Sequence, residues 1–204
     1  MAYDGEVRLA ALAFAGCGFA PTVSGATIVD APAADDDAAP TIDVPTALCP
    51  ASYVVTIAAS PTRYRVITTG ADFNTHHASC NADAPGATHL ASFETSAEAM
   101  AIQTVLQGVT PPAPADQYYI GAVQEPDQAT TDAAWFVFTG APLPAGLWAP
   151  TQPNDDNPGE NNEENLGAIN AVDLLHDTTG DILYGAVCEC DGQAIDPTVQ
   201  SYIP

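Results

Sequence analysis

The chain has 204 residues, and its 26 Asp and Glu stand against three Arg and no Lys, which gives a formal net charge of −23 at pH 7. Nucleic acids and anionic membrane surfaces are normally bound through clusters of Lys and Arg, so this composition argues against both as partners. Hydrophobic residues make up 47% of the chain, which suffices for one domain of ordinary size together with additional segments.

The N-terminal segment, residues 1–17, has the pattern of an export signal. Arg8 precedes an apolar run at 9–15 that is too short to remain in a bilayer as a membrane span. The run ends in Phe-Ala-Gly-Cys at Cys17, which resembles a bacterial lipobox, where the cysteine is lipidated and becomes the new N-terminus. We therefore expect an exported protein of the bacterial cell envelope or the extracellular space, with a lipid on Cys17 as its one membrane contact. Acidic residues before Arg8 are unusual for a signal peptide, which leaves a plain apolar tail as the alternative.

Two further segments lack the pattern of a folded domain. Residues 18–46 are rich in Ala, Pro and Asp and sustain no hydrophobic period. Such a segment buries too little apolar area to offset the entropy of ordering, so we predict a disordered tether. Residues 193–204 are predicted as a short polar tail, and the folded segment is assigned to 47–192.

Five cysteines, at positions 17, 49, 80, 188 and 190, leave four for disulfides if Cys17 carries a lipid, and four cysteines can pair in three ways. Cys188 and Cys190 lie two residues apart on a predicted strand, so their side chains point in the same direction. This favours two different partners over a bond between them. Disulfides in turn favour an oxidising compartment.

The folded segment begins with mixed signals and then shows one strong helix. Thr95 and Glu98 have the form of a capping box, and Ile102, Val105 and Leu106 follow at helical spacing, which predicts an amphipathic helix over 95–107. Short apolar runs broken by Gly, Pro and Asn predict strands at 118–122, 134–138 and 183–188. A long loop rich in Asn, Asp and Glu is expected between the last two of them.

Several short motifs follow one another in a specific order. They are Cys49-Pro50, Tyr64, Cys80, His89-Leu90-Ala91-Ser92-Phe93, Tyr119-Ile120-Gly121-Ala122, Trp135, Thr139-Gly140, Trp148-Ala149-Pro150-Thr151-Gln152-Pro153-Asn154 and Val187-Cys188-Glu189. In this order they resemble the C-type lectin-like domain over nearly the whole folded segment. The resemblance implies an α+β fold in which two helices flank short antiparallel sheets and a long loop of the calcium-binding type.

The same resemblance implies the disulfides. It pairs Cys80 with Cys188 as the outer bridge of the family. The family's inner loop bridge would fall on Asn165 and Gly180, and neither is a cysteine. Arg63 occupies the position of the cysteine with which the opening Cys49 pairs in long-form members. Because the first and last strands of this fold lie side by side, we predict a Cys49–Cys190 bridge in its place.

The resemblance also implies a calcium site in the long loop. Its ligands would be Gln152, Asn154, Glu163, His176 and Asp177. Ca²⁺ takes six to eight oxygen ligands, so the imidazole of His176, which stands where the family has Asn, is the poorest ligand of the set. The remaining coordination positions would take two adjacent sugar hydroxyls, which would also hydrogen-bond to Gln152, Asn154, Glu163 and Asp177.

A weaker match concerns the family's accessory calcium site, for which the candidate residues are Asp155, Glu164, Asp127 and Asp132. For all of these acids the alternative is a solvated acidic loop in a chain that is acidic throughout.

Other aromatic and histidine side chains are assigned to the structure rather than to a site. Trp135 is predicted as core, and Trp148 as a support of the loop. His76 and His77 fall on an expected first helix as partly exposed residues, and His89 carries no functional signal.

These features are compatible with two binding functions and do not favour an enzyme. The first is a calcium-dependent carbohydrate-binding lectin module, displayed on a bacterial cell surface and binding a glycan or glycoconjugate. The alternative is a calcium-independent lectin-like scaffold that binds a protein or another surface ligand. An enzyme is not expected, because the chain has no nucleophile elbow, phosphate loop or zinc-protease helix.

Overall fold

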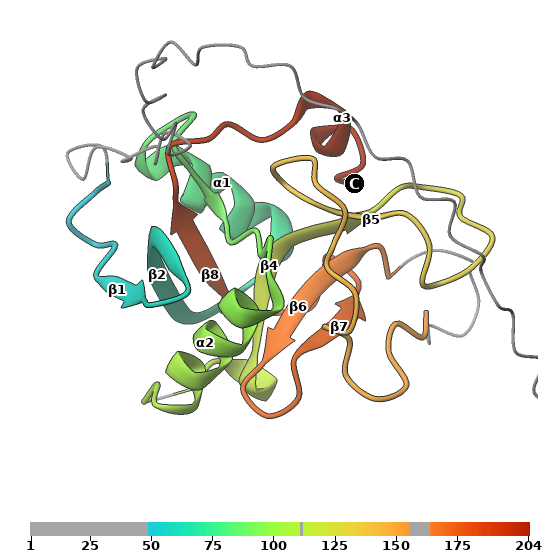
Figure 1. Ribbon diagram of the computed structural model, residues 1–204, viewed down its shortest axis with the longest axis horizontal. Helices are drawn as coiled ribbons and strands as arrows, with labels where there is room; N and C mark the ends of the chain where they lie inside the picture. The colour runs from blue at the N-terminus through green and yellow to red at the C-terminus, as the bar shows by residue number, and fades with distance from the viewer. Residues whose placement is uncertain (1–48, 111, 156–163) are drawn as a thin grey trace, which may run out of the picture. The chain divides into compact units, whose positions relative to one another are not determined.

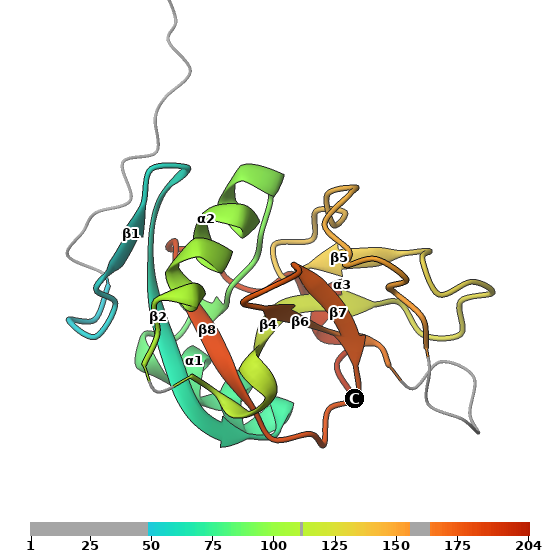
Figure 2. The same ribbon diagram turned by 90° about the horizontal axis from the view of Figure 1, so that it is seen from below.

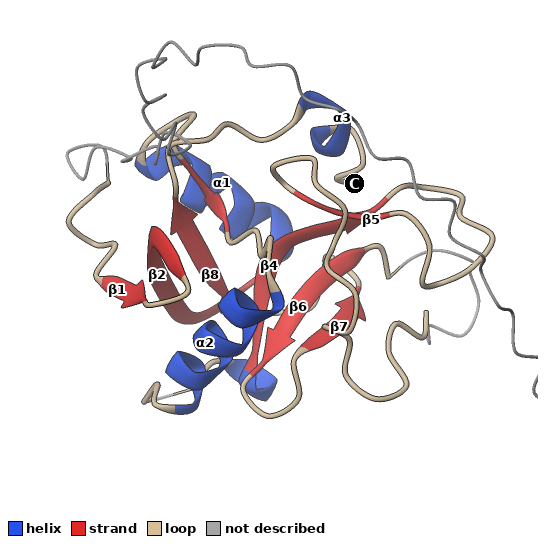
Figure 3. Ribbon diagram, viewed as in Figure 1, coloured by secondary structure: helices blue, strands red, loops and turns tan. Residues whose placement is uncertain are grey.

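In the computed structural model, the described residues form a sheet of eight strands and three α-helices (Figures 1 and 3). The structure describes residues 49–110, 112–155 and 164–204. The signal-like segment with Cys17, the tether at 18–46 and Glu163 therefore lie outside the described residues. In chain order the elements are β1 (Val55–Ile57), β2 (Ser60–Ala71), α1 (Phe73–Asp83), β3 (Thr88–Leu90), α2 (Ser96–Gln107), the 3₁₀ turn η1 (Pro114–Asp116), β4 (Gln117–Gln124), β5 (Trp135–Val137), β6 (Leu166–Asn170), β7 (Leu175–Thr178), β8 (Tyr184–Cys190) and α3 (Pro197–Gln200).

The sheet brings the beginning and the end of the domain together. Its main path runs β1-β2-β8-β4-β6-β7, with β3 added on β8 and β5 on β4. β8 pairs antiparallel with β2 and β3 and parallel with β4. The expected pairing of the first and last strands is found between β2, which carries Tyr64, and β8, while β1 lies beyond β2 at the edge of the sheet. The fold is α+β as predicted.

The two long helices cover different faces of the sheet, and Figure 2 shows them on either side of β8. Side chains alternate between the faces along a strand. Tyr119 of β4 therefore packs with Phe73 of α1 in one core cluster, while Tyr118 packs with Ile102 and Leu106 of α2 in the other. The sheet is thus covered on both faces.

Helix α2 starts where its capping residues predict. The side chain of Thr95 accepts the backbone N–H of Glu98 at 3.2 Å, and Glu98 Oε2 accepts the N–H of Glu94 at 3.1 Å. The hydroxyl of Tyr64, on β2, donates to the other oxygen of Glu98. A carboxylate that is only 2% exposed thereby has partners on both oxygens and joins the helix to the sheet.

Both expected disulfides are present. Cys49 bonds to Cys190 and Cys80 bonds to Cys188. Cys188 and Cys190 lie on the same side of β8 and reach two different partners, as their spacing predicts. One bridge ties the start of the described domain to the end of β8, and the other ties α1 to the same strand.

The predicted long loop is shorter than expected, because its second half folds into β6 and β7. These strands pair antiparallel, with Gly167 opposite Asp177. Leu166, Ile169 and Leu175 are buried in the two cores. The sequence pattern did not predict these strands, because they are short, contain few apolar residues and are separated by a turn. They are stabilised by pairing, β6 with β4 and β7 with β6.

The segment predicted as a polar tail packs against the domain instead. Asp196 accepts the N–H groups of Thr198 and Val199 and so caps the short helix α3. Val199 is 2% exposed, and Tyr202 and Ile203 pack against the α1-side core. Ile195 packs there as well. The segment was predicted as a tail because its polar residues outweigh the few apolar side chains that hold it to the core.

Candidate functional site

The first half of the long loop is fixed to β7 through one carboxylate. The peptide bond between Gln152 and Pro153 is cis. The next two backbone N–H groups, of Asn154 and Asp155, donate to Asp177 Oδ2 at 2.9 and 2.8 Å. Asp177 lies on β7, so the structure brings the Gln-Pro-Asn segment and Asp177 together, although 23 residues separate Asn154 from Asp177.

Two oxygens of this group are buried without a hydrogen bond from the described residues. They are Asp177 Oδ1 and Gln152 Oε1. Asp177 as a whole is 7% exposed, and an unsatisfied buried oxygen costs about 1–3 kcal/mol, more when it is charged. A cation bound to these oxygens would remove that cost, and amide and carboxylate oxygens are the donors that Ca²⁺ prefers. The donors in this part of the loop therefore fit a hard divalent cation.

The electrostatics of Asp177 agree with this donor set. Burial raises the pKa of its carboxyl above the ordinary value, the backbone N–H donors oppose the rise, and the neighbouring Asp155 carboxylate adds to it. The two described arginines lie on β2, and Arg65 is already paired with Asp83 at 2.7 Å. No side-chain cation of the described residues neutralises Asp177.

The structure places the other expected ligands differently. Asn154 is exposed, and Glu163 lies outside the described residues. His176 is neighbour to Asp177 on β7, and adjacent strand residues point to opposite faces. Its Nε2 lies 3.9 Å from Asp173 Oδ1. The imidazole therefore faces a different carboxylate from the one that holds the loop.

The accessory residues are only partly brought together. The loop that carries Asp127 and Asp132 lies against the Gln-Pro-Asn segment, because Thr131 Oγ1 donates to the carbonyl of Pro153 at 3.1 Å. Both aspartates are exposed. Within the described ranges, no three of the four accessory carboxylates approach closely enough to form a group of metal ligands.

Two tryptophans pack beneath the loops that carry Thr131 and the Gln-Pro-Asn segment and connect them to the sheet. Trp135 of β5 is 5% exposed, which confirms its assignment to the core, and its Nε1 donates to the carbonyl of Thr131 at 2.8 Å. Trp148 packs edge-on against it, with ring centroids 4.7 Å apart, and the backbone of Trp148 bridges to Leu175 of β7. The pair joins β5, β7 and both loops, which is the supporting role expected of Trp148.

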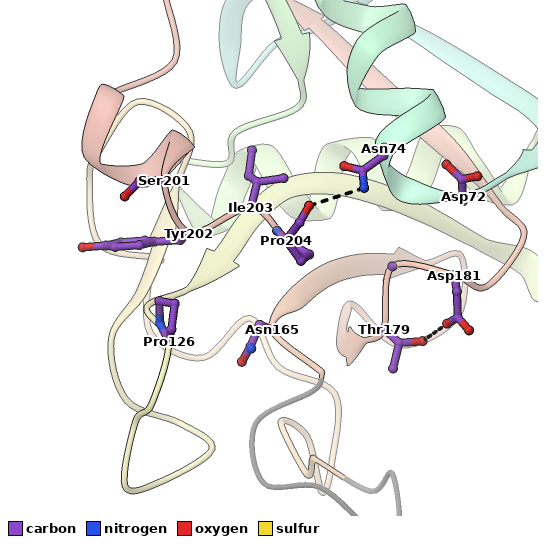
Figure 4. Close-up of a pocket in the computed structure, with 11 residues that line it drawn as sticks. Asp72, Asn74, Pro126, Asn165, Thr179, Asp181, Ser201, Tyr202, Ile203 and Pro204 are labelled. Atoms are coloured by element: carbon purple, nitrogen blue, oxygen red, sulfur yellow. Dashed lines mark hydrogen bonds between the residues drawn. The ribbon is translucent and has the colours of Figure 1, made fainter.

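A wide, open pocket of about 830 Å³ lies apart from the predicted ligands (Figure 4). The last residues of the chain, 201–204, line it opposite Asn165 and Thr179. Asn74 Nδ2 donates to the carbonyl of Pro204 at 3.4 Å, and Thr179 Oγ1 donates to Asp181. The pocket shares no residue with the predicted calcium ligands.

A second polar group, which no sequence motif indicated, is buried where β3 meets β8. It consists of His89, Glu189 and Asp191, whose nearest ligand atoms all lie within 4.8 Å of one another. His89 and Glu189 are 0% exposed and Asp191 is 4% exposed. About 100 residues separate the histidine from the two acids, and only the pairing of β3 with β8 makes them neighbours.

Comparisons with known proteins concern the fold. No protein-family model and no curated protein sequence matches this chain. The C-type lectin CEL-I from Cucumaria echinata is 17% identical with a TM-score of 0.58, over 71% of this chain and 99% of CEL-I. The carbohydrate-recognition domain of the human scavenger receptor C-type lectin is 16% identical with a TM-score of 0.54, over 70% and 98%. A calcium-independent type II antifreeze protein is 18% identical with a TM-score of 0.50, over 70% and 94%.

None of the helices in the described part of the chain has the length and apolar character needed to cross a bilayer.

Proposed function

We propose that this chain, which has the C-type lectin-like fold, binds carbohydrate through a calcium ion held by its long loop. The observation that carries the proposal is the pair of buried oxygens, Gln152 Oε1 and Asp177 Oδ1, that no described group satisfies. The ion would be coordinated by these two oxygens. Asn154 and Glu163 complete the proposed ligand set. His176 is left out because its imidazole faces Asp173. Asp127, Asp132, Asp155 and Glu164 are not proposed as a second site, since among the described residues no three of them form a group of metal ligands.

The ion would bind the sugar hydroxyls, and side chains of the protein would set the orientation of the sugar. Vicinal sugar hydroxyls bind a hard cation through their oxygens. Gln152, Asn154, Glu163 and Asp177 would then exchange hydrogen bonds with the same hydroxyls, which gives orientation as well as affinity. No bond of the sugar is broken in this scheme, so the module binds its ligand without chemistry.

We propose further that the module acts outside the cytoplasm. The two disulfides fit an oxidising compartment. The signal-like residues 1–17 and a lipid on Cys17 would hold the module at a bacterial cell surface, with 18–46 as its tether.

A calcium titration of the full chain tests the proposal. By calorimetry we expect a dissociation constant of about 10⁻⁴ to 10⁻³ M, as in other extracellular calcium modules. Asp177→Asn should remove the binding heat, because the buried ligand loses its charge. Asp181→Asn, an equal change at an exposed position just after β7, is the matched control and should bind as the parent does.

A glycan array with and without chelator then separates the two candidate functions. Sugar binding that chelator abolishes supports the proposal. The second candidate, a calcium-independent scaffold, is favoured by His176 at a ligand position and by the calcium-independent antifreeze protein among the similar structures. Ligand binding that is equal with and without chelator, together with no calcium heat, would establish that function instead.

A further inference from the structure

A buried group at the junction of β3 and β8 has the ligands of a metal site. The β3–β8 register places His89 directly opposite Glu189, and paired residues in an antiparallel sheet project to the same face. Asp191 follows β8 immediately. The cysteines on both sides of Glu189 are held in the two disulfides, so the strand that carries the carboxylate is fixed at two points.

Hydrogen bonds fix which nitrogen of His89 faces the group. Nδ1 lies 2.7 Å from the carbonyl of Leu90, and a carbonyl accepts only, so Nδ1 carries the proton. In a neutral ring Nε2 then presents a lone pair. Nε2 lies 3.2 Å from Asp191 Oδ1. Two lone pairs at this distance require a cation between them, which is either a proton or a metal ion.

Hydrogen bonds from neighbouring groups hold both carboxylates in place. The backbone N–H of Gln193 donates to Asp191 Oδ1 at 2.8 Å, and its side-chain N–H donates to Oδ2 at 3.0 Å. The N–H of Ser92 donates to Glu189 Oε2 at 2.7 Å. Glu189 Oε1 is buried and has no hydrogen-bond partner among the described residues. Hydrogen bonds of this kind orient the ligands of metal ions. They leave His89 Nε2, Glu189 Oε1 and the second lone pair of Asp191 Oδ1 for the interior of the group.

The donor set distinguishes the occupant. One imidazole and two carboxylates suit Zn²⁺, whereas Ca²⁺ takes oxygen ligands. Ligand atoms about 2.0–2.2 Å from a tetrahedral zinc lie about 3.4 Å apart, close to the observed separation of Nε2 and Oδ1. A proton on Nε2 would satisfy the His89–Asp191 contact but would leave Glu189 Oε1 without a partner. A metal ion satisfies all three residues.

We propose that His89, Glu189 and Asp191 bind a zinc ion that is structural, with water at the fourth position. The group is buried from solvent, so the ion would link β3, the end of β8 and the following turn rather than meet a ligand. The site shares no residue with the proposed calcium site.

The test measures metal content and spectroscopy on the full chain. The protein is analysed as purified and again after refolding with zinc, and we expect one Zn²⁺ per chain with an increased melting temperature. After refolding with Ca²⁺ in place of zinc, we expect no metal ion bound at this site. Replacement by Co²⁺ should produce the intense visible absorption of a four-coordinate ion.

Variants locate the ion. His89→Gln and Asp191→Asn should weaken zinc binding by on the order of 100-fold, while His77→Gln, at a half-buried histidine of α1 outside the group, should leave it unchanged. Should a variant fail to fold, the cobalt spectrum of the parent chain remains the test. Absence of zinc in both preparations, a six-coordinate cobalt spectrum, or undiminished zinc binding in a folded His89→Gln variant would each overturn the proposal.

Discussion

His76 illustrates how one buried side chain sets a pH dependence. The sequence suggested a partly exposed helix residue, but His76 is 3% exposed, because the first turn of α1 packs on the sheet. Its Nε2 lies 2.9 Å from the carbonyl of Tyr184, so the neutral ring donates a hydrogen bond to β8. Burial lowers the pKa of His76 below its ordinary value, and the contacts with the Tyr184 carbonyl and Asp72 offset only part of that effect.

We predict that acid destabilises the fold through His76. The folded-state pKa lies below the unfolded value of about 6.5, so on acidification the unfolded chain takes up the proton first. The stability is therefore present above about pH 6.5 and is lost as the pH falls toward the folded-state pKa. Urea unfolding between about pH 5 and 7.5 measures this. His76→Gln should show a flatter profile.

The control for that experiment lies on the same helix. Ala78 is exposed, so Ala78→Gln introduces the same side chain without touching the buried ring and should keep the parent profile. A His76→Gln profile as steep as that of the parent would refute the assignment.

At the scale of elements, the parts that the sequence predicted are those with local causes. Helix α2 begins at Thr95 because its own side chain caps it, and β4 lies in a run of apolar residues. By contrast, β6 depends on pairing with β4 and β7, and β7 depends on pairing with β6. The same limit applies to the sites. The order of motifs identified Gln152 and Asp177, whereas His89, Glu189 and Asp191 become neighbours only through the β3–β8 register.

Both disulfides have one cysteine on β8, which lies in the middle of the sheet. Removing either disulfide should therefore lower the stability of the whole domain. Cys49–Cys190 closes 141 residues and Cys80–Cys188 closes 108. Loop-closure entropy grows only with the logarithm of length, so each bridge should contribute a similar amount, about 2–5 kcal/mol. We expect this loss in the free energy of unfolding for each paired Cys→Ala variant.

Denaturant unfolding at equal pH provides the measurement. The reduced and alkylated parent chain is the control, since it lacks both bridges and should be less stable than either paired variant. A paired variant with parental stability would show that its bridge does not constrain the unfolded chain.

For the molecule as a whole, the net charge of −23 is the largest electrostatic feature. Of the three arginines, only Arg63 and Arg65 fall in the described residues, and Arg65 is committed to Asp83 at 2.7 Å and lies over the ring of Tyr53. Little positive charge is left to balance the acidic surface. Folding brings these carboxylates closer together, so their repulsion opposes the compact state.

We therefore predict that simple salt stabilises this protein. The Debye length falls from about 30 Å at 0.01 M to about 10 Å at 0.1 M ionic strength, which screens repulsion between surface carboxylates. Each kcal/mol of repulsion removed should raise the melting temperature by about 2–4 °C for a domain of this size. Melting curves in NaCl and KCl should rise together, because screening does not depend on the identity of the monovalent ion. Calcium at millimolar concentration adds little ionic strength, so a further rise with calcium that Asp177→Asn removes would come from the loop site. A melting temperature that stays constant or falls with NaCl would mean that acidic repulsion does not limit the stability of the fold.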